Sequence, residues 1–91
     1  MKVLYSPQYN QNEIINYSFN GDIITVEYKE QIDTFDFTEF TDGILTDIET
    51  ALPFKPVISA KRVDGILEVK LLNFIGENAS YEEKFPEWME A

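Results

Sequence analysis

The pair Asn20-Gly21, set between two segments of alternating apolar and polar residues, restricts the fold more than any other feature of this chain. Asparagine and glycine tolerate the positive φ that a two-residue hairpin turn requires at both central positions. A turn at this place pairs Phe19 with Asp22, Tyr17 with Ile24, and Ile15 with Val26. One face of the ribbon is then apolar, because it carries Ile15, Tyr17, Phe19, Ile24, Val26 and Tyr28. Turn chemistry and residue pattern therefore predict the same β-hairpin.

A second reversal at Glu30-Gln31 adds a third strand to this hairpin. Neither residue favours positive φ, but the register brings Phe35 and Phe37 onto the apolar face. Residues 13–37 therefore read as a three-stranded meander with one buried side.

A second hairpin turn is predicted at Asp64-Gly65. It pairs Val63 with Ile66, Lys61 with Glu68, Ala60 with Val69, and Ile58 with Leu71. The residues Lys2 to Tyr5 supply a further short strand.

The remaining segments predict little helix. Thr46 with Glu49, and Ser80 with Glu83, have the spacing of a capping box. We expect helical turns from Asp47 to Leu52 and before Pro86, with Pro53 and Pro56 preventing a longer helix in the middle of the chain.

The prediction is one domain, residues 1–91, in the mainly β (α+β) class. Antiparallel hairpins and a meander of five or six strands form a small sandwich or curled sheet, with one or two short helices. Its expected core is Ile15, Tyr17, Ile24, Val26, Phe35, Phe37, Ile58, Ala60, Val69 and Leu71.

Composition removes several classes of function. There is no cysteine and no histidine, so thiolate chemistry, imidazole metal ligands and a Ser-His-Asp triad are absent. The chain has 17 acidic and 7 basic residues, a formal charge of −10, which opposes binding to nucleic acid or to anionic lipid. No apolar run reaches the length of about 18 residues that a membrane span needs. The N-terminal residues also contain no apolar run long enough for the core of a signal peptide. We expect a protein of the cytoplasm.

The acidic residues do not form a recognisable site. Asp33, Asp36, Glu39 and Asp42 recur every three residues, but alternate faces of a strand would separate them, and the calcium-loop pattern is missing. No spacing singles out a pair of carboxylates for hydrolysis. We therefore predict no catalytic residue, no metal and no cofactor.

The C-terminal segment is the most suggestive part of the sequence. It concentrates the only tryptophan with other large side chains among acids: Tyr81, Phe85, Trp88 and Met89. Aromatic residues in such a terminus either dock onto their own domain or contact another chain. These four are the candidate partner-contact residues.

Several blocks of the chain, from about residue 33 to its end, resemble a known group of proteins. They are Phe35-Asp36-Phe37-Thr38, Asp42-Gly43, Leu52-Pro53, 56–60 (Pro-Val-Ile-Ser-Ala), 64–75 (from Asp-Gly-Ile-Leu to Asn-Phe-Ile) and Phe85-Pro86-Glu87-Trp88. The group consists of small uncharacterised proteins encoded in phages and prophages of Gram-positive bacteria, often near tail genes. The resemblance implies no catalytic or binding residue, because none is established for that group.

The resulting functional hypothesis is a non-enzymatic phage or prophage protein with a tail-associated structural or assembly role. It would act through protein–protein contacts in the host cytoplasm or in the virion, and an unpaired strand edge would also allow homo-oligomers. Two alternatives stay open: an acidic inhibitor that mimics nucleic acid on a basic host protein, and a small hydrolase.

Overall fold

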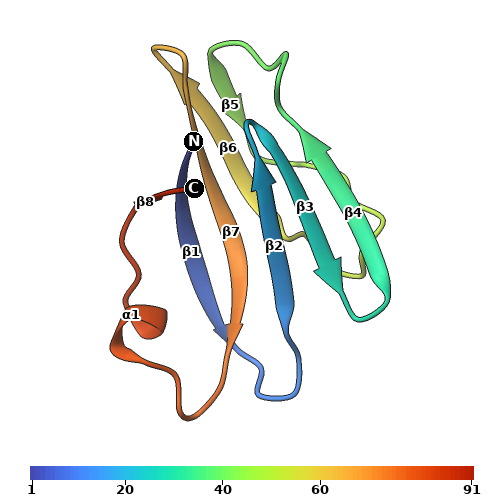
Figure 1. Cartoon of the computed structure of the whole chain (residues 1–91), viewed down its shortest axis with the longest axis vertical. Coiled ribbons are helices and arrows are strands. Elements are labelled where there is room, and N and C mark those ends of the chain that lie inside the picture. Colours follow the sequence, from blue (N-terminus) through green and yellow to red (C-terminus); the bar gives the residue numbers. More distant parts are fainter.

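Two β-sheets face each other in the computed structural model, which describes residues 1–91 (Figure 1). The elements in chain order are β1 (Lys2–Tyr9), β2 (Ile15–Asn20), β3 (Ile23–Tyr28), β4 (Gln31–Asp36), β5 (Gly43–Leu45), β6 (Val57–Val63), β7 (Ile66–Ile75), α1 (Tyr81–Lys84) and β8 (Met89–Glu90). Sheet A has the order β5-β6-β7-β1-β8, and sheet B has the order β2-β3-β4. The mainly β class is confirmed, but there are eight strands instead of five or six, and one short helix.

Sheet B is the predicted meander, in a different register. Ile15 pairs with Tyr28 and Phe19 with Ile24, so the first turn lies at Gly21-Asp22 and not at Asn20-Gly21. Gly21 has φ +60° and Asp22 has no positive φ, as in a type II′ turn, which places glycine at the first central position.

The second turn of sheet B is displaced in the same way. Tyr28 pairs with Gln31, so the turn lies at Lys29-Glu30 and not at Glu30-Gln31. Lys29 takes a φ of +55°, which is uncommon for a residue with a side chain. Its ammonium group pairs with Glu13, with 3.3 Å between nitrogen and oxygen.

The β6–β7 hairpin confirms three of the four predicted pairs. Asp64 and Gly65 have φ of +53° and +81°, as a type I′ turn requires. The pairing of Ile58 with Leu71 is wrong, because a β-bulge between Val57 and Ser59 shifts the register. Val57 therefore lies opposite Leu71 and is 1% exposed, whereas Ile58 is turned outward and is 37% exposed.

The N-terminal strand is longer than predicted and lies inside sheet A. It pairs in parallel with β7 over its whole length, from Lys2 opposite Glu68 to Tyr9 opposite Ile75. Its other edge pairs with the two residues of β8, which run antiparallel to it. Figure 1 shows β1 between β7 and the returning C-terminal segment.

The helical turn predicted from Asp47 to Leu52 does not form. This segment is an irregular loop that is held to β4 through Asp33. The predicted C-terminal helix does form as α1, with both hydrogen bonds of the capping box between Ser80 and Glu83, and it ends before Pro86.

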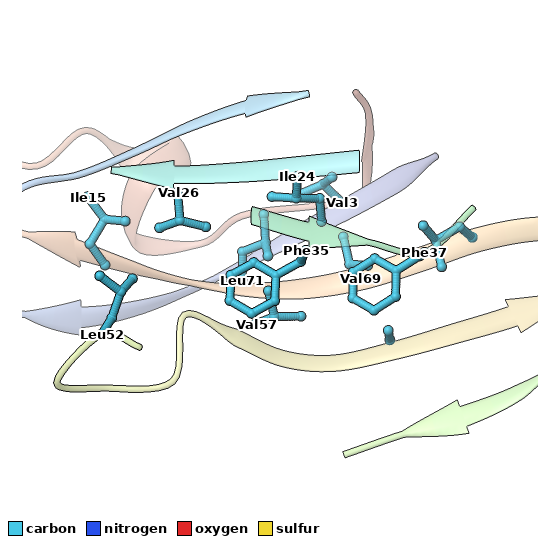
Figure 2. Close-up of a cluster of buried hydrophobic side chains, with 12 residues drawn as sticks. Val3, Ile15, Ile24, Val26, Phe35, Phe37, Leu52, Val57, Val69 and Leu71 are labelled. Atoms are coloured by element: carbon cyan, nitrogen blue, oxygen red, sulfur yellow. The ribbon is translucent and has the colours of Figure 1, made fainter. Parts of the chain in front are cut away.

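The core fills the space between the two sheets (Figure 2). It consists of Val3, Ile15, Ile24, Val26, Phe35, Phe37, Leu52, Val57, Ala60, Leu67, Val69 and Leu71. Of the predicted core residues, Tyr17 is only partly buried and Ile58 is excluded. Tyr17 nevertheless links the sheets, because its hydroxyl donates to the carbonyl oxygen of Leu72 in β7. The only helix, α1, is too short to cross a membrane.

Candidate protein-binding groove

Residues 81–91, which we call the C-terminal arm, are anchored at both ends. At the start, the Ser80 hydroxyl accepts from the Glu83 N–H at 3.2 Å, and the Glu83 carboxylate accepts from the Ser80 N–H at 3.1 Å. At the end, β8 pairs with β1, and the Ala91 N–H donates to the Met1 carbonyl at 3.0 Å. The arm therefore returns alongside β1 instead of projecting from the fold (Figure 1).

A hollow of about 1010 Å³ lies between the arm and sheet A, and we call it the C-terminal groove. Sheet A contributes Tyr5 and Pro7 from β1 and Asn73 from β7, and the arm contributes every residue from Tyr81 to Met89. Its size is at the upper end of the range of about 300 to 1,000 Å³ that ligand pockets occupy.

All four candidate partner-contact residues line this one groove. Tyr81, Phe85, Trp88 and Met89 remain between 44% and 73% exposed. The rings of Tyr81 and Phe85 pack together with their centroids 5.1 Å apart. The arm thus docks through its ends and its backbone, while its largest side chains stay accessible.

Sequence reasoning missed the contribution of sheet A to the groove. The sequence placed Tyr5 only at the end of a short strand, and in the structure its ring packs against Tyr17, with ring centroids 5.9 Å apart. Its other side lines the groove together with Pro7 and Asn73. Burial raises the pKa of the Tyr5 hydroxyl above its ordinary value of 10.0, so this ring is neutral near pH 7.

The charge of the groove is negative. Glu82, Glu83 and Glu87 line it against one cation, Lys84. The whole chain adds to this field with a formal charge of −10. Positively charged groups are therefore attracted to the groove, most strongly at low salt.

Beside the groove, most of β1 has an unpaired edge. The register with β8 covers only Lys2 and Val3, so the edge from Leu4 to Tyr9 has no strand next to it. Unpaired N–H and C=O groups at a sheet edge are a template for another strand.

Two of the four acidic residues that recur every three positions, Asp33 and Asp36, form local hydrogen bonds. Asp33 accepts from the Thr50 hydroxyl at 2.6 Å and from the Ala51 N–H at 2.9 Å, and the Thr50 bond is the main reason that its pKa is lowered. Asp36 accepts from the side chain and the N–H of Thr38, which lowers its pKa too. No group of three or more such residues is placed to hold a metal ion.

The carboxyl groups with a displaced pKa do not resemble acid catalysts. Hydrogen bonds lower the pKa of Asp33 and Asp36, and Lys55 lowers that of Asp47. A carboxylic acid that donates a proton in hydrolysis needs a raised pKa in a cleft. None of these three carboxyl groups has the raised pKa of such a proton donor.

Comparisons with models of protein families, with curated proteins and with solved structures find no match for this chain.

Proposed function

We propose that this chain is a non-enzymatic protein-binding module that takes a basic partner in its C-terminal groove, and that it serves a phage or prophage as a tail-associated structural or assembly component. The observation that carries the binding role is the exposure of Tyr81, Phe85, Trp88 and Met89 along one hollow. Large side chains of this kind supply most of the free energy in protein interfaces.

The anchored arm makes this groove a suitable binding surface. A free terminal segment would lose conformational entropy when it docks onto a partner. Here the capping box and the β8 pairing already restrict residues 81–91. Less ordering is then required on binding, so more of the contact energy contributes to affinity.

The phage or prophage role is supported by the resemblance of the sequence blocks between residue 33 and the C-terminus. Those blocks include the β6–β7 hairpin and the segment Phe85-Pro86-Glu87-Trp88, which lines the groove. In this proposal the protein works in the host cytoplasm during assembly or stays in the virion.

The test is capture of partners from infected or induced host cells by the immobilised full chain, together with mass spectrometry of mature virions. We expect capture of a virion or assembly protein, and a loss of about tenfold or more with Trp88→Ala or Phe85→Ala. Ile32→Ala is the control, because Ile32 is 62% exposed, close to the 63% of Phe85, but lies on β4 and does not line the groove. Equal losses with all three variants would contradict the groove as the binding site.

The acidic-inhibitor alternative is favoured by one observation, the charge of −10. It predicts that capture recovers only a host nucleic-acid-binding protein and that added DNA competes with this protein for capture. Such a result would replace the assembly role. Capture of a virion protein that is indifferent to DNA would instead support assembly.

A further inference from the structure

We propose that the partner enters the C-terminal groove as an extended strand. This strand pairs antiparallel with the part of the β1 edge that β8 leaves free. This inference rests on the proposed binding role of the groove and specifies its occupant: a strand that alternates apolar and basic residues. Addition of a strand to an exposed edge is a recurring mode of peptide recognition.

The orientation of the β1 backbone supports this mode. Ala91 donates to the Met1 carbonyl on the β8 side, whereas Asn10 donates to the Ile75 carbonyl on the β7 side. Successive residues of a strand present their N–H and C=O groups to opposite neighbours. The backbone N–H and C=O groups of the odd-numbered residues of β1 therefore point toward the β8 side of the strand. Beyond Val3 these residues are Tyr5, Pro7 and Tyr9.

These free groups lie where the groove is. Tyr5 and Pro7 line it, and the arm forms its other wall from Tyr81 to Met89. An incoming strand would thus pair with Tyr5 through two hydrogen bonds while its side chains contact the aromatic residues of the arm. Pro7 has no N–H, so it offers only its carbonyl oxygen as an acceptor.

The register also determines which side chains of the partner face inward. Residues directly opposite each other in an antiparallel pair share a face of the sheet. Tyr5 faces inward, as shown by its contact with Tyr17. The partner residue that exchanges hydrogen bonds with Tyr5 therefore also faces inward and is apolar, and its neighbours along the strand face outward.

Charge complementarity favours basic residues at the other positions of the partner strand. The groove has three glutamates against Lys84, and the field of the whole chain is negative. An acidic strand would be repelled, whereas lysine or arginine at the alternate positions is attracted.

The experiment uses the full chain and three synthetic peptides in which valine alternates with lysine. One has an unmodified backbone, one is N-methylated at every valine, and one is N-methylated at every lysine. All three have the same charge and side chains, so they differ only in which backbone N–H groups remain. Binding is followed by calorimetry and by hydrogen exchange of the Tyr5 and Tyr9 amides.

We expect the unmodified and the lysine-methylated peptides to bind and to slow exchange of the Tyr5 amide by about tenfold or more. The valine-methylated peptide should bind at least about tenfold more weakly, because the N–H groups that face β1 are the ones it lacks. Equal binding by all three peptides, or no binding by the unmodified one, would overturn the inference. So would slow, concentration-dependent exchange at Tyr5 without peptide, which would show that a second copy of the chain occupies the edge.

These outcomes separate this inference from the proposed function. If Trp88→Ala abolishes partner capture but the Tyr5 amide gains no protection in the complex, the groove binds its partner without strand addition. If the peptides bind as expected but no partner capture depends on Trp88, the edge is competent and the proposed function is wrong.

Discussion

At the scale of single residues, Arg62 is the main polar link between the two sheets. From β6 its guanidinium donates to the Asp22 carboxylate at 2.9 Å and to the carbonyls of Phe37 at 2.7 Å and Phe40 at 2.5 Å. A fourth bond, at 3.0 Å, reaches the Gly65 carbonyl. The side chain is only 11% exposed, so water cannot replace these bonds easily.

Arg62→Ala should lower the free energy of unfolding by about 2 to 4 kcal/mol, because it leaves several acceptors without a donor. Urea denaturation measures this loss. The control is Lys61→Ala, an exposed cation next in the same strand, which should change the free energy by less than about 0.5 kcal/mol. Equal effects of the two substitutions would show that the hydrogen bonds of Arg62 contribute no more than a surface charge.

No pattern in the sequence predicts the partners of the Arg62 guanidinium. Three of its four acceptors are backbone carbonyls, and these come from a turn and from the segment after β4. Carbonyl oxygens are present at every residue, so no residue type marks them in the sequence.

Asp33→Asn should make stability less dependent on pH on the acid side. The hydrogen bond from Thr50 holds the pKa of Asp33 below its ordinary value of 3.8. A lowered pKa means that the ionised carboxylate stabilises the fold above the ordinary pKa, and that this contribution disappears as pH falls through the folded-state pKa.

Near pH 7 we expect Asp33→Asn to cost about 1 kcal/mol, since the site is partly exposed and solvent weakens its hydrogen bonds. The variant and the parent should converge as pH falls below the lowered pKa of Asp33. Urea denaturation across this range measures both values. Glu39→Gln is the control, because Glu39 forms no hydrogen bond or ion pair, and an identical acid profile for both variants would contradict the role of Asp33.

At the scale of elements, alternation predicted the faces of sheet B even though the turns were misplaced. Moving each turn by one residue changes the pairing register by two. Side chains alternate with a period of two, so every residue keeps its face. Ile15, Ile24, Val26 and Phe35 are therefore buried as predicted. At the β-bulge near Ile58 the shift is one residue, and there the prediction failed.

The turn between β6 and β7 should depend on its glycine. Gly65 has φ +81°, and no atom lies within 4 Å of a Cβ placed on it, so a substitution acts through the backbone alone. Gly65→Ala should lower the free energy of unfolding by about 1 kcal/mol, measured by thermal denaturation. Gly76→Ala should be close to neutral, because Gly76 has no positive φ and its Cβ would meet Gln11 at an ordinary 3.6 Å. A larger cost at Gly76 would contradict this.

The β1 edge gives a further prediction for Pro7. Its missing N–H lies on the unpaired side of β1, where proline removes a donor from an edge that another chain would otherwise extend. Pro7→Val restores that donor, so we expect a higher fraction of dimer in sedimentation experiments. Gln8→Val is the control, because residue 8 presents its N–H to β7 instead. More dimer from Gln8→Val than from Pro7→Val would contradict the assigned orientation of β1.

At the scale of the whole molecule, only one of the two walls of the groove could be predicted from the sequence. Tyr81, Phe85, Trp88 and Met89 are close together in sequence and share a composition that marks them. The opposite wall comes from Tyr5 and Asn73, which are brought together by the parallel pairing of β1 with β7. No turn connects those two strands, so local sequence patterns contain no information about their register.

The sandwich and the arm should be separable, because every core residue lies between Val3 and Leu71. Helix α1 buries no residue, and both residues of β8 are exposed. Residues 1–79 alone should therefore keep a cooperative unfolding transition and lose only about 1 kcal/mol, mostly the pairing of β8 with β1.

Urea denaturation of the truncated chain, followed by tyrosine fluorescence and circular dichroism, tests this expectation. The truncated chain should fold yet capture no partner, because one wall of the groove is gone. Ser80→Ala keeps the arm but removes its helix cap. Its capture of the partner should lie between that of the full chain and that of the truncated chain. A loss above about 3 kcal/mol, or a non-cooperative transition, would mean that the arm stabilises the sandwich itself. The exposure of its aromatic residues would then no longer distinguish a binding surface from a structural support.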